Sequence, residues 1–224
     1  MFPLGSNTGT RTYPVITWTL TALMMLIYLW DRQWNLLGPS TVFVGLTMRP
    51  AEITHAFTGG PTFPLVTLFT SIFLHGSILH IVGNLIFLNV FGPLVESAFG
   101  APLYALYFIF WGVIAGLTQA FVNPHSMIPT LGASGAISGV LGAYLLLFPA
   151  TKIQLLILII DIFVPAWMLL ALWFAYQIFV PQEGIANWAH VGGFLIGMIT
   201  VLVQGGRHKI LAGREHDFYQ HLYT

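Results

Sequence analysis

The longest apolar runs of this chain decide what it can fold into. Leu65 to Leu94 is thirty residues of largely apolar sequence, and Ile153 to Val180 is a second such stretch. Each exceeds the roughly 20 residues that one helical crossing of a bilayer needs. The 224 residues include only 7 Lys and Arg and 7 Asp and Glu, too few charges to solubilise a globule of this size. The sequence therefore predicts an all-α integral membrane protein with several transmembrane helices.

Polar breaks divide the apolar sequence into six expected spans. The HGS triplet at 75–77 interrupts the first long run, so the second span is expected to begin near Ser77. Asp161 and Pro165 interrupt the other run, because proline breaks a helix and a charge is costly in lipid. The six predicted spans are 14–30, 77–95, 102–122, 134–148, 166–180 and 189–203.

The predicted organisation is a single six-span domain with two short tails. Residues 1–13 form a short N-terminus, 14–203 the domain, and 204–224 a polar C-terminal tail. A long loop, 33–64, follows the first span, and its mixture of aromatic and polar residues suits short helical pieces lying in the membrane interface. The chain is therefore expected to form a six-helix bundle in contact with the lipid bilayer.

Basic residues predict which side of the membrane holds the termini. Six spans place both termini on one side. The basic residues on that side are Arg11, Lys152, Arg207, Lys209 and Arg214, against Arg32 and Arg49 opposite. Because cytoplasmic loops carry the excess of Lys and Arg, the expected localisation is a multi-pass protein of the cell membrane with both termini in the cytoplasm.

Composition also excludes several kinds of site. The chain has no cysteine, which removes disulfides, thiol nucleophiles and cysteine-ligated metals. The formal net charge is zero and no basic cluster is interleaved with aromatics, so no nucleic-acid partner is expected. No cofactor is predicted either.

Four polar residues are expected at one depth inside the bundle. The second, fourth and sixth spans all enter from the external face, which brings their first residues to the same leaflet. The external ends of these spans carry His80 and Asn84, then Ser134, then His190. An unpaired neutral polar group in lipid costs roughly 2–7 kcal/mol. We therefore expect these side chains to be partners around a cavity.

Ser134 and His190 have the chemistry of a nucleophile and its base. A hydroxyl attacks poorly alone and needs an imidazole to take its proton, which contributes about 10²–10⁴ in rate. A buried imidazole stays neutral and can accept that proton at pH 7. Each residue also has a structural interpretation, Ser134 as a helix cap and His190 as a donor to a backbone carbonyl. The catalytic interpretation predicts a separation of about 2.6–3.2 Å between the Ser134 hydroxyl and the ring.

Small residues predict how two helices bring this pair together. Gly135 and Gly139 are four apart in the fourth span, and Ala189, Gly193 and Gly197 repeat at the same interval in the sixth. Such stripes allow close approach of two helix backbones. Packing them against each other would bring Ser134 and His190 into contact, while the free N–H groups at the helix start could bind an oxyanion.

His80 and Asn84 are spaced i,i+4 and share one face of the second span. Both donate hydrogen bonds without carrying charge, which suits an oxyanion hole. A metal site formed by His75, His80 and His190 is the alternative, but no HExxH pattern or paired carboxylate accompanies them.

The expected catalytic unit is a dyad without a carboxylate. Asp161 follows the fourth span on the cytoplasmic side, and Glu183 precedes the sixth. Neither is expected at the depth of Ser134 and His190. An ionised carboxylate there would cost about 2.5 kcal/mol or more.

With these residues the sequence resembles the rhomboid family of intramembrane serine proteases. The matching segments are FLHGSILHIVGNLIFLNVFG at 73–92, GASGAISG at 132–139 and AHVGGFLIG at 189–197. The resemblance implies Ser134 as nucleophile and His190 as general base. It implies that His80, Asn84 and the Ser134 N–H stabilise the oxyanion. It also implies transmembrane protein substrates with a single span, and a lateral gate at the fifth span.

One position departs from part of that family. Some members carry an aromatic residue four positions after the serine, packed beneath the histidine, whereas this chain has Ser138. The imidazole must then be oriented by another contact. The predicted function is an intramembrane serine endopeptidase. The alternatives are a non-catalytic rhomboid-like protein that binds membrane clients, and a small channel or transporter that uses the polar cavity.

Overall fold

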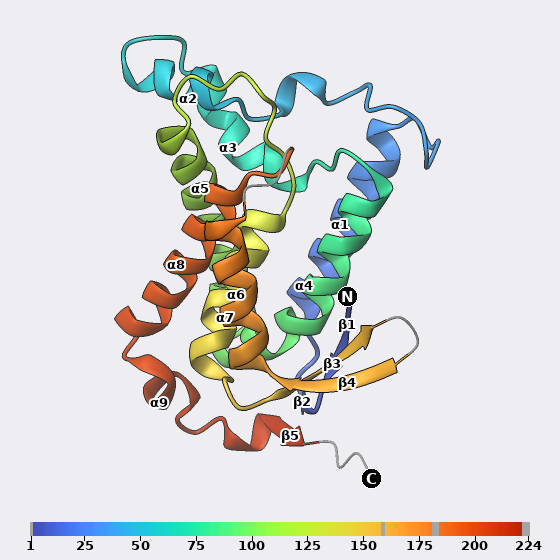
Figure 1. The fold of residues 1–224 in the computed structure, drawn as a ribbon, viewed down its shortest axis with the longest axis vertical. Coiled ribbons are helices and arrows are strands. Elements are labelled where there is room, and N and C mark those ends of the chain that lie inside the picture. Colours follow the sequence, from blue (N-terminus) through green and yellow to red (C-terminus); the bar gives the residue numbers. More distant parts are fainter. Residues whose placement is uncertain (1, 158–159, 181–183, 221–224) are drawn as a thin grey trace.

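Six long helices dominate the computed structural model, which describes residues 2–157, 160–180 and 184–220 (Figure 1). They are α1 Val15–Asp31, α4 Ile78–Phe99, α5 Ala101–Val122, α6 Ser134–Leu147, α7 Ala166–Phe179 and α8 Asn187–Val203. Their ends lie within a few residues of the predicted spans. The mostly helical bundle follows from the apolar runs, because a buried backbone without water must satisfy its hydrogen bonds internally.

Two of these helices have the length of a full crossing. α4 and α5 are apolar helices of 22 residues each, while the other four helices contain 14–17 residues. A 14-residue helix spans about 21 Å, which is less than the roughly 30 Å hydrocarbon core. The number of helices that cross the bilayer therefore stays a prediction.

The loop after α1 forms short helices, as its composition predicts. It contains η1 Val44–Leu46, α2 Pro50–Phe57, η2 Phe63–Val66, α3 Thr67–Thr70 and η3 Ser71–Phe73. This loop lies at the end of the bundle where α2 and α3 are labelled in Figure 1. It is a set of packed turns and helices rather than an extended chain.

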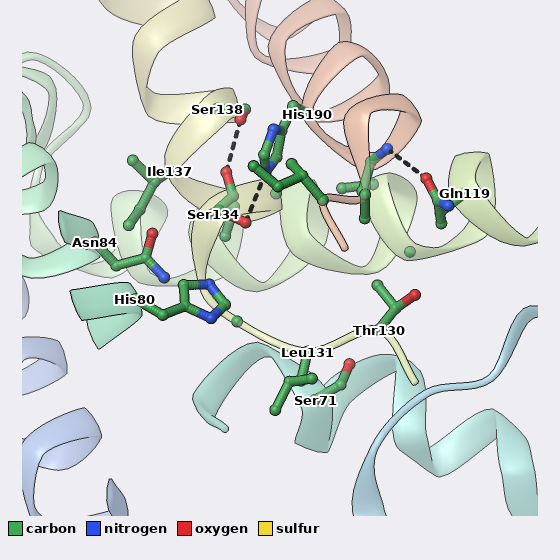
Figure 2. A pocket seen from close by; sticks show the side chains of 18 of the residues that line it. Ser71, His80, Asn84, Gln119, Thr130, Leu131, Ser134, Ile137, Ser138 and His190 are labelled. Carbon is green, nitrogen blue, oxygen red and sulfur yellow. Dashed lines mark hydrogen bonds between the residues drawn. The ribbon is translucent and has the colours of Figure 1, made fainter. Parts of the chain in front are cut away.

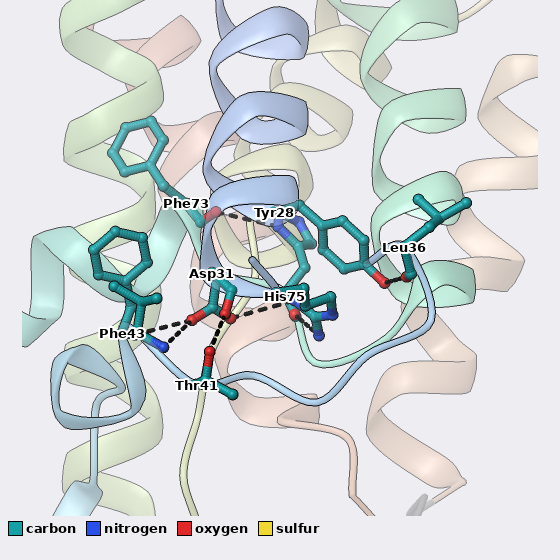
Figure 3. A network of polar contacts seen from close by, with 9 residues as sticks. Tyr28, Asp31, Leu36, Thr41, Phe43, Phe73 and His75 are labelled. Atoms are coloured by element: carbon teal, nitrogen blue, oxygen red, sulfur yellow. Dashed lines mark hydrogen bonds and ion pairs between the residues drawn. The ribbon is translucent and has the colours of Figure 1, made fainter. Parts of the chain in front are cut away.

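A polar network anchors the first loop to the bundle (Figure 3). Asp31 Oδ1 accepts hydrogen bonds from the backbone N–H groups of Val42 at 3.2 Å and Phe43 at 2.9 Å. Arg32 is buried, stacks on Tyr28 with its guanidinium carbon 3.8 Å from the ring centroid, and donates to the His75 carbonyl at 2.8 Å. Charge-assisted bonds to buried backbone groups are among the stronger hydrogen bonds. The end of α1 is thereby tied to the segment that leads into α4.

Two small sheets correct the all-α expectation. Strands β1 Phe2–Ser6, β3 Lys152–Ile157 and β4 Ile160–Pro165 form an antiparallel sheet in the order β1-β3-β4, and β2 Thr8–Thr10 pairs with β5 Phe218–Gln220. Along β3, Ile153 and Leu155 are buried while Lys152 and Gln154 are more exposed. This period of two is typical of a strand with one covered face. The apolar content of the run outweighed that alternation in the sequence-based prediction.

The sheets lie at the end of the bundle opposite α2 and α3 (Figure 1). The tail also contains α9 Gly206–Leu211 and the short turn η4 Glu215–Asp217.

The Glu96 carboxylate, near the end of α4, accepts hydrogen bonds at 2.8 Å from the Ile16 N–H, the Thr17 N–H and the Thr17 hydroxyl. A carboxylate at a helix N-terminus pairs with free N–H groups and the helix dipole. Glu96 therefore fixes the start of α1 to α4.

Helix α6 lies in the middle of the bundle and packs closely against α8. A Cβ added to Gly193 would collide with the Gly135 carbonyl oxygen, and one added to Gly197 would collide with the Gly139 carbonyl oxygen. The two small-residue stripes therefore face each other, as predicted, and the backbones touch. Gly142 extends this contact by another turn, against the Phe194 carbonyl.

Substituting alanine for Gly197 tests this contact. We expect Gly197→Ala to destabilise the protein by roughly 1–3 kcal/mol, because an extra methyl in a filled interface forces the helices apart. The matched control is Gly83→Ala in α4, where an added Cβ meets nothing within 4 Å and better helix propensity is expected to stabilise by about 0.5–1 kcal/mol. Thermal unfolding in detergent, followed by circular dichroism, measures both; equal melting temperatures would contradict the packing argument.

Candidate active site

The first turns of α4, α6 and α8 meet at a cavity of about 1010 Å³. All four polar residues predicted at one depth line it, namely His80, Asn84, Ser134 and His190 (Figure 2). Among the described residues, no Asp or Glu lines this cavity. The described part of its lining therefore combines apolar residues with uncharged polar ones.

Ser134 is the first residue of α6 and contacts His190 directly. Its Oγ lies 2.8 Å from His190 Nε2, within the range expected from the sequence. No side chain caps α6, so Ser134 does not serve as a helix cap. As the first helical residue it also presents an N–H that has no acceptor within the helix. The hydroxyl is thus paired with an imidazole next to free backbone donors.

Contacts from α7 surround the His190 ring. His190 Nδ1 lies 2.8 Å from Gln177 Oε1, and the Trp173 ring centroid lies 5.9 Å from that of His190. Ser138 stands at the position where an aromatic side chain could have packed beneath the histidine. Its hydroxyl donates to the Ser134 carbonyl at 2.6 Å. The hydrogen-bond partner of His190 Nδ1 therefore lies on α7, while that of Nε2 lies on α6.

Sequence reasoning missed Gln177 as a partner of His190. Gln177 is a lone amide in the apolar sequence AWMLLALWFAYQIF, and it is buried. A polar side chain within a predicted span is a sign that it faces a partner or a cavity. The sequence therefore indicates that Gln177 faces a partner or a cavity, but the identity of the partner depends on how α7 packs. Gln119 was missed in the same way, and its Oε1 accepts the Ala189 N–H at 3.2 Å.

His80 and Asn84 lie against the backbone that leads into Ser134. Ser77 caps α4 by accepting the His80 N–H at 3.2 Å. Gly132 has φ of +118°, and a Cβ there would lie 2.5 Å from His80 Nε2 and 3.5 Å from Asn84 Nδ2. The His80 ring and the positive φ therefore both require glycine at this turn, whereas Asn84 lies only at ordinary contact distance.

The side-chain amide of Asn84 is a donor without an acceptor. Within the described ranges, its Nδ2 is buried and has no hydrogen-bond partner. Leaving a buried donor unpaired costs about 1–3 kcal/mol, and such groups are rare in folded proteins. An oxygen entering the cavity would satisfy it.

Two further residues named in the sequence analysis, His75 and Asp161, do not line the cavity. His75 is buried outside the cavity, with Nδ1 3.3 Å from the Phe73 carbonyl and its ring against His80. Burial above all, and then the neighbouring His80 imidazole, lower the pKa of His75 to about 3, so this ring stays neutral. Asp161 lies in β4 and does not line the cavity. Glu183 lies outside the described residues.

A metal site is not supported by the arrangement of the described residues. They contain no group of three or more His, Cys, Asp or Glu that could hold a metal ion. His190 already uses both ring nitrogens, one toward Ser134 and one toward Gln177. A metal ligand needs one of them free.

Comparison with known proteins places the chain among the rhomboids. Residues 63–207, more than half of the chain, match the family described as "Rhomboid domain". The chain is 28% identical over 206 residues to "Rhomboid protease GlpG" of Salmonella newport (strain SL254), which covers 90% of this chain and 67% of that protein. It is 32% identical over 166 residues to "RHOMBOID-like protein 12, mitochondrial" of Arabidopsis thaliana, covering 65% of this chain.

Several of these relatives are considerably longer than the matched region. The match covers 48% of the mitochondrial Arabidopsis protein and 43% of "RHOMBOID-like protein 5" from the same plant. The chain thus spans less than half the length of these two relatives. "Rhomboid protease GluP" of Bacillus subtilis (strain 168) is 28% identical over 138 residues, 62% of this chain and 26% of that protein.

The geometry predicts that one hydroxyl of this cavity is unusually reactive. A serine-directed fluorophosphonate is expected to label Ser134, because the adjacent imidazole can accept its proton as the phosphorus is attacked. Ser134→Ala should abolish labelling, detected by in-gel fluorescence and mass spectrometry. Ser138→Ala is the matched control, since Ser138 lies one turn later and its hydroxyl bonds only the Ser134 carbonyl among described groups. Equal labelling of the Ser134→Ala variant would contradict this assignment.

Proposed function

This chain belongs to the rhomboid family, and on that premise we propose that it is an intramembrane serine endopeptidase that cleaves single-span transmembrane proteins. Family membership places it in a membrane. The observation that carries the proposal is the 2.8 Å contact between Ser134 Oγ and His190 Nε2 inside a polar cavity. Ser134 is the nucleophile and His190 the general base.

The reaction begins with attack of Ser134 Oγ on the carbonyl carbon of the scissile bond. His190 Nε2 takes the hydroxyl proton as the new C–O bond forms, which leaves a tetrahedral oxyanion. His190 then gives that proton to the leaving amine as the C–N bond breaks. Water attacks the acyl-enzyme with the same assistance and releases the carboxylic acid and the free serine.

Three uncharged donors are available for the oxyanion. They are the Asn84 amide, the His80 ring and the Ser134 N–H. The unpaired Nδ2 of Asn84 supports this role, since a donor that no protein acceptor holds is available to a new acceptor. In a cavity with low effective dielectric these dipoles act more strongly than they would in water.

The proposed orientation places both termini, and the small sheets, in the cytoplasm. Five of the seven Lys and Arg residues then lie on the cytoplasmic side, as the distribution of basic residues in membrane proteins favours. The cavity opens near the first turns of α4, α6 and α8, which then lie toward the external leaflet. A transmembrane substrate would present its scissile bond at that depth, within the membrane.

Removing the nucleophile is the principal test of this function. Purified protein is incubated in liposomes with a single-span substrate whose transmembrane helix contains small, helix-destabilising residues. We expect Ser134→Ala to reduce cleavage by more than about 10⁴-fold, because the nucleophile itself is lost, and Ser138→Ala to remain active. Cleavage that persists in Ser134→Ala would remove the serine mechanism. A wild-type protein that binds this substrate without cleaving it would instead favour a client-binding function.

A substitution in α4 tests the oxyanion assignment. Asn84→Leu is expected to lower kcat by about 10²–10³-fold, the usual cost of losing one oxyanion donor. The effect should fall on kcat rather than KM, since the interaction forms only in the transition state. Asn89→Leu is the matched control, because Asn89 is an exposed residue of the same helix that bonds Thr21 and the Leu85 carbonyl. Equal kcat in the two variants would exclude Asn84 from the oxyanion site.

A further inference from the structure

We propose that Gln177 is a positioning residue that holds His190 in the one tautomer able to accept a proton from Ser134, and that Asn187 in turn fixes the Gln177 amide. This inference rests on the proposed function, because it concerns the same imidazole. It assigns a task to α7, a helix that contributes neither the nucleophile nor the base. It also explains how His190 is oriented although position 138 is a serine.

The argument begins at two backbone carbonyls, whose atoms are unambiguous. Asn187 Nδ2 lies 3.1 Å from the Gln177 carbonyl oxygen and 3.5 Å from that of Val180. Carbonyl oxygens only accept hydrogen bonds. The side-chain atom of Asn187 that faces them must therefore be its amide nitrogen.

The same nitrogen fixes the orientation of the Gln177 side chain. Asn187 Nδ2 is 3.2 Å from the side-chain atom assigned as Gln177 Oε1. The Asn187 amide has two hydrogens, and its two shorter contacts are those to the Gln177 carbonyl and to this side-chain atom. Because Asn187 donates there, the Gln177 atom that receives the bond must be the oxygen. With the opposite amide orientation, two N–H groups would face each other. The assignment of this oxygen thus follows from the network.

The orientation of Gln177 then decides where His190 carries its proton. Gln177 Oε1 lies 2.8 Å from His190 Nδ1. An oxygen without hydrogen can only accept, so in the neutral imidazole Nδ1 carries the hydrogen and Nε2 has the lone pair. That lone pair faces the Ser134 hydroxyl at 2.8 Å. The other neutral tautomer would leave Nδ1 and Oε1 as two facing acceptors.

Burial strengthens the effect that the contacts of Gln177 with Asn187 and His190 have on the tautomer. Gln177 is 7% exposed and His190 is 9% exposed, so water does not readily replace a lost partner. Trp173 lies one turn before Gln177 on α7 and packs against the His190 ring. The amide fixes the tautomer, and the indole restricts the tilt of the ring. Both act from α7, so the geometry of the dyad depends on how α7 is seated.

Two substitutions at Gln177 separate a role in positioning from a role in packing. Gln177→Met keeps the shape and removes the acceptor, and kcat is expected to fall about tenfold or more with little change in KM. Gln177→Glu restores an acceptor and should recover activity at high pH. Its carboxylate stabilises the imidazolium, so His190 is a free base only at higher pH and the acidic limb of the kcat/KM profile moves upward. His80 and Tyr176 are the other titratable groups lining the cavity, and neither is changed.

Gln204→Met is the matched control, because Gln204 is exposed at the end of α8, beyond the cavity. It should leave kcat and the pH profile unaltered. Full kcat in Gln177→Met, or an unshifted acidic limb in Gln177→Glu, would overturn the assignment. Loss of activity in both variants, with an equal fall in melting temperature, would also overturn it by showing a purely structural role.

A spectroscopic measurement tests the tautomer without requiring activity. In protein labelled with ¹⁵N-histidine, with His190 assigned from the His190→Gln difference spectrum, Nδ1 should give a protonated signal and Nε2 an unprotonated one. Gln177→Met should mix the two tautomers, and Asn187→Leu should move the spectrum in the same direction. An unchanged His190 spectrum in Gln177→Met would overturn the proposal. If the wild type carries the expected tautomer but cleaves nothing, the endopeptidase function fails while the positioning role stands.

Discussion

The backbone contact between α6 and α8 is the interaction on which the rest of the site depends. Glycines on both helices remove the side chains that would hold the two axes apart, and carbonyl oxygens fill the space where a Cβ would stand. Ser134 begins one helix and His190 lies in the first turn of the other. Serine has a short side chain, so a 2.8 Å hydrogen bond from Ser134 to an imidazole on a neighbouring helix requires this close approach of the backbones.

A second constraint follows from burial in an apolar bundle, where each polar atom needs a partner. Most of the site obeys this rule: His190 uses both ring nitrogens, and Gln119 pairs with the first turn of α8. The Asn84 amide is the exception among the described residues at the cavity. An unpaired donor beside a paired nucleophile is the arrangement expected where charge develops only during a reaction. The proposed catalytic roles are consistent with that difference.

Much of this arrangement could be predicted from the sequence, and the exceptions have physical reasons. Apolar runs broken by Pro, Asp and HGS indicate the long helices, and the parity of the spans groups His80, Asn84, Ser134 and His190. The strand β3 was missed because its alternation is hidden in a run of Ile and Leu that also suits a buried helix. Gln177 was missed for another reason: its contact with His190 depends on the rotation of α7 about its axis. A single sequence indicates that an amide is buried, but not which helix it faces.

The amide beside His190 fits a cavity that is lined by no acidic residue of the described ranges. An ionised carboxylate at the position of the Gln177 amide would cost about 2.5 kcal/mol or more. Whenever His190 is neutral, that carboxylate would be a buried charge without a positive partner. Gln177 can accept the same Nδ1 hydrogen with no such cost. In the proposed mechanism, however, an uncharged amide would neutralise little of the positive charge that His190 gains during attack. The proposed mechanism therefore assigns most of the stabilisation of the transition state to the other side of Ser134, where Asn84, His80 and the start of α6 are the proposed oxyanion donors. The uncharged partner of His190 and the uncharged donors proposed for the oxyanion are thus two consequences of the same apolar environment.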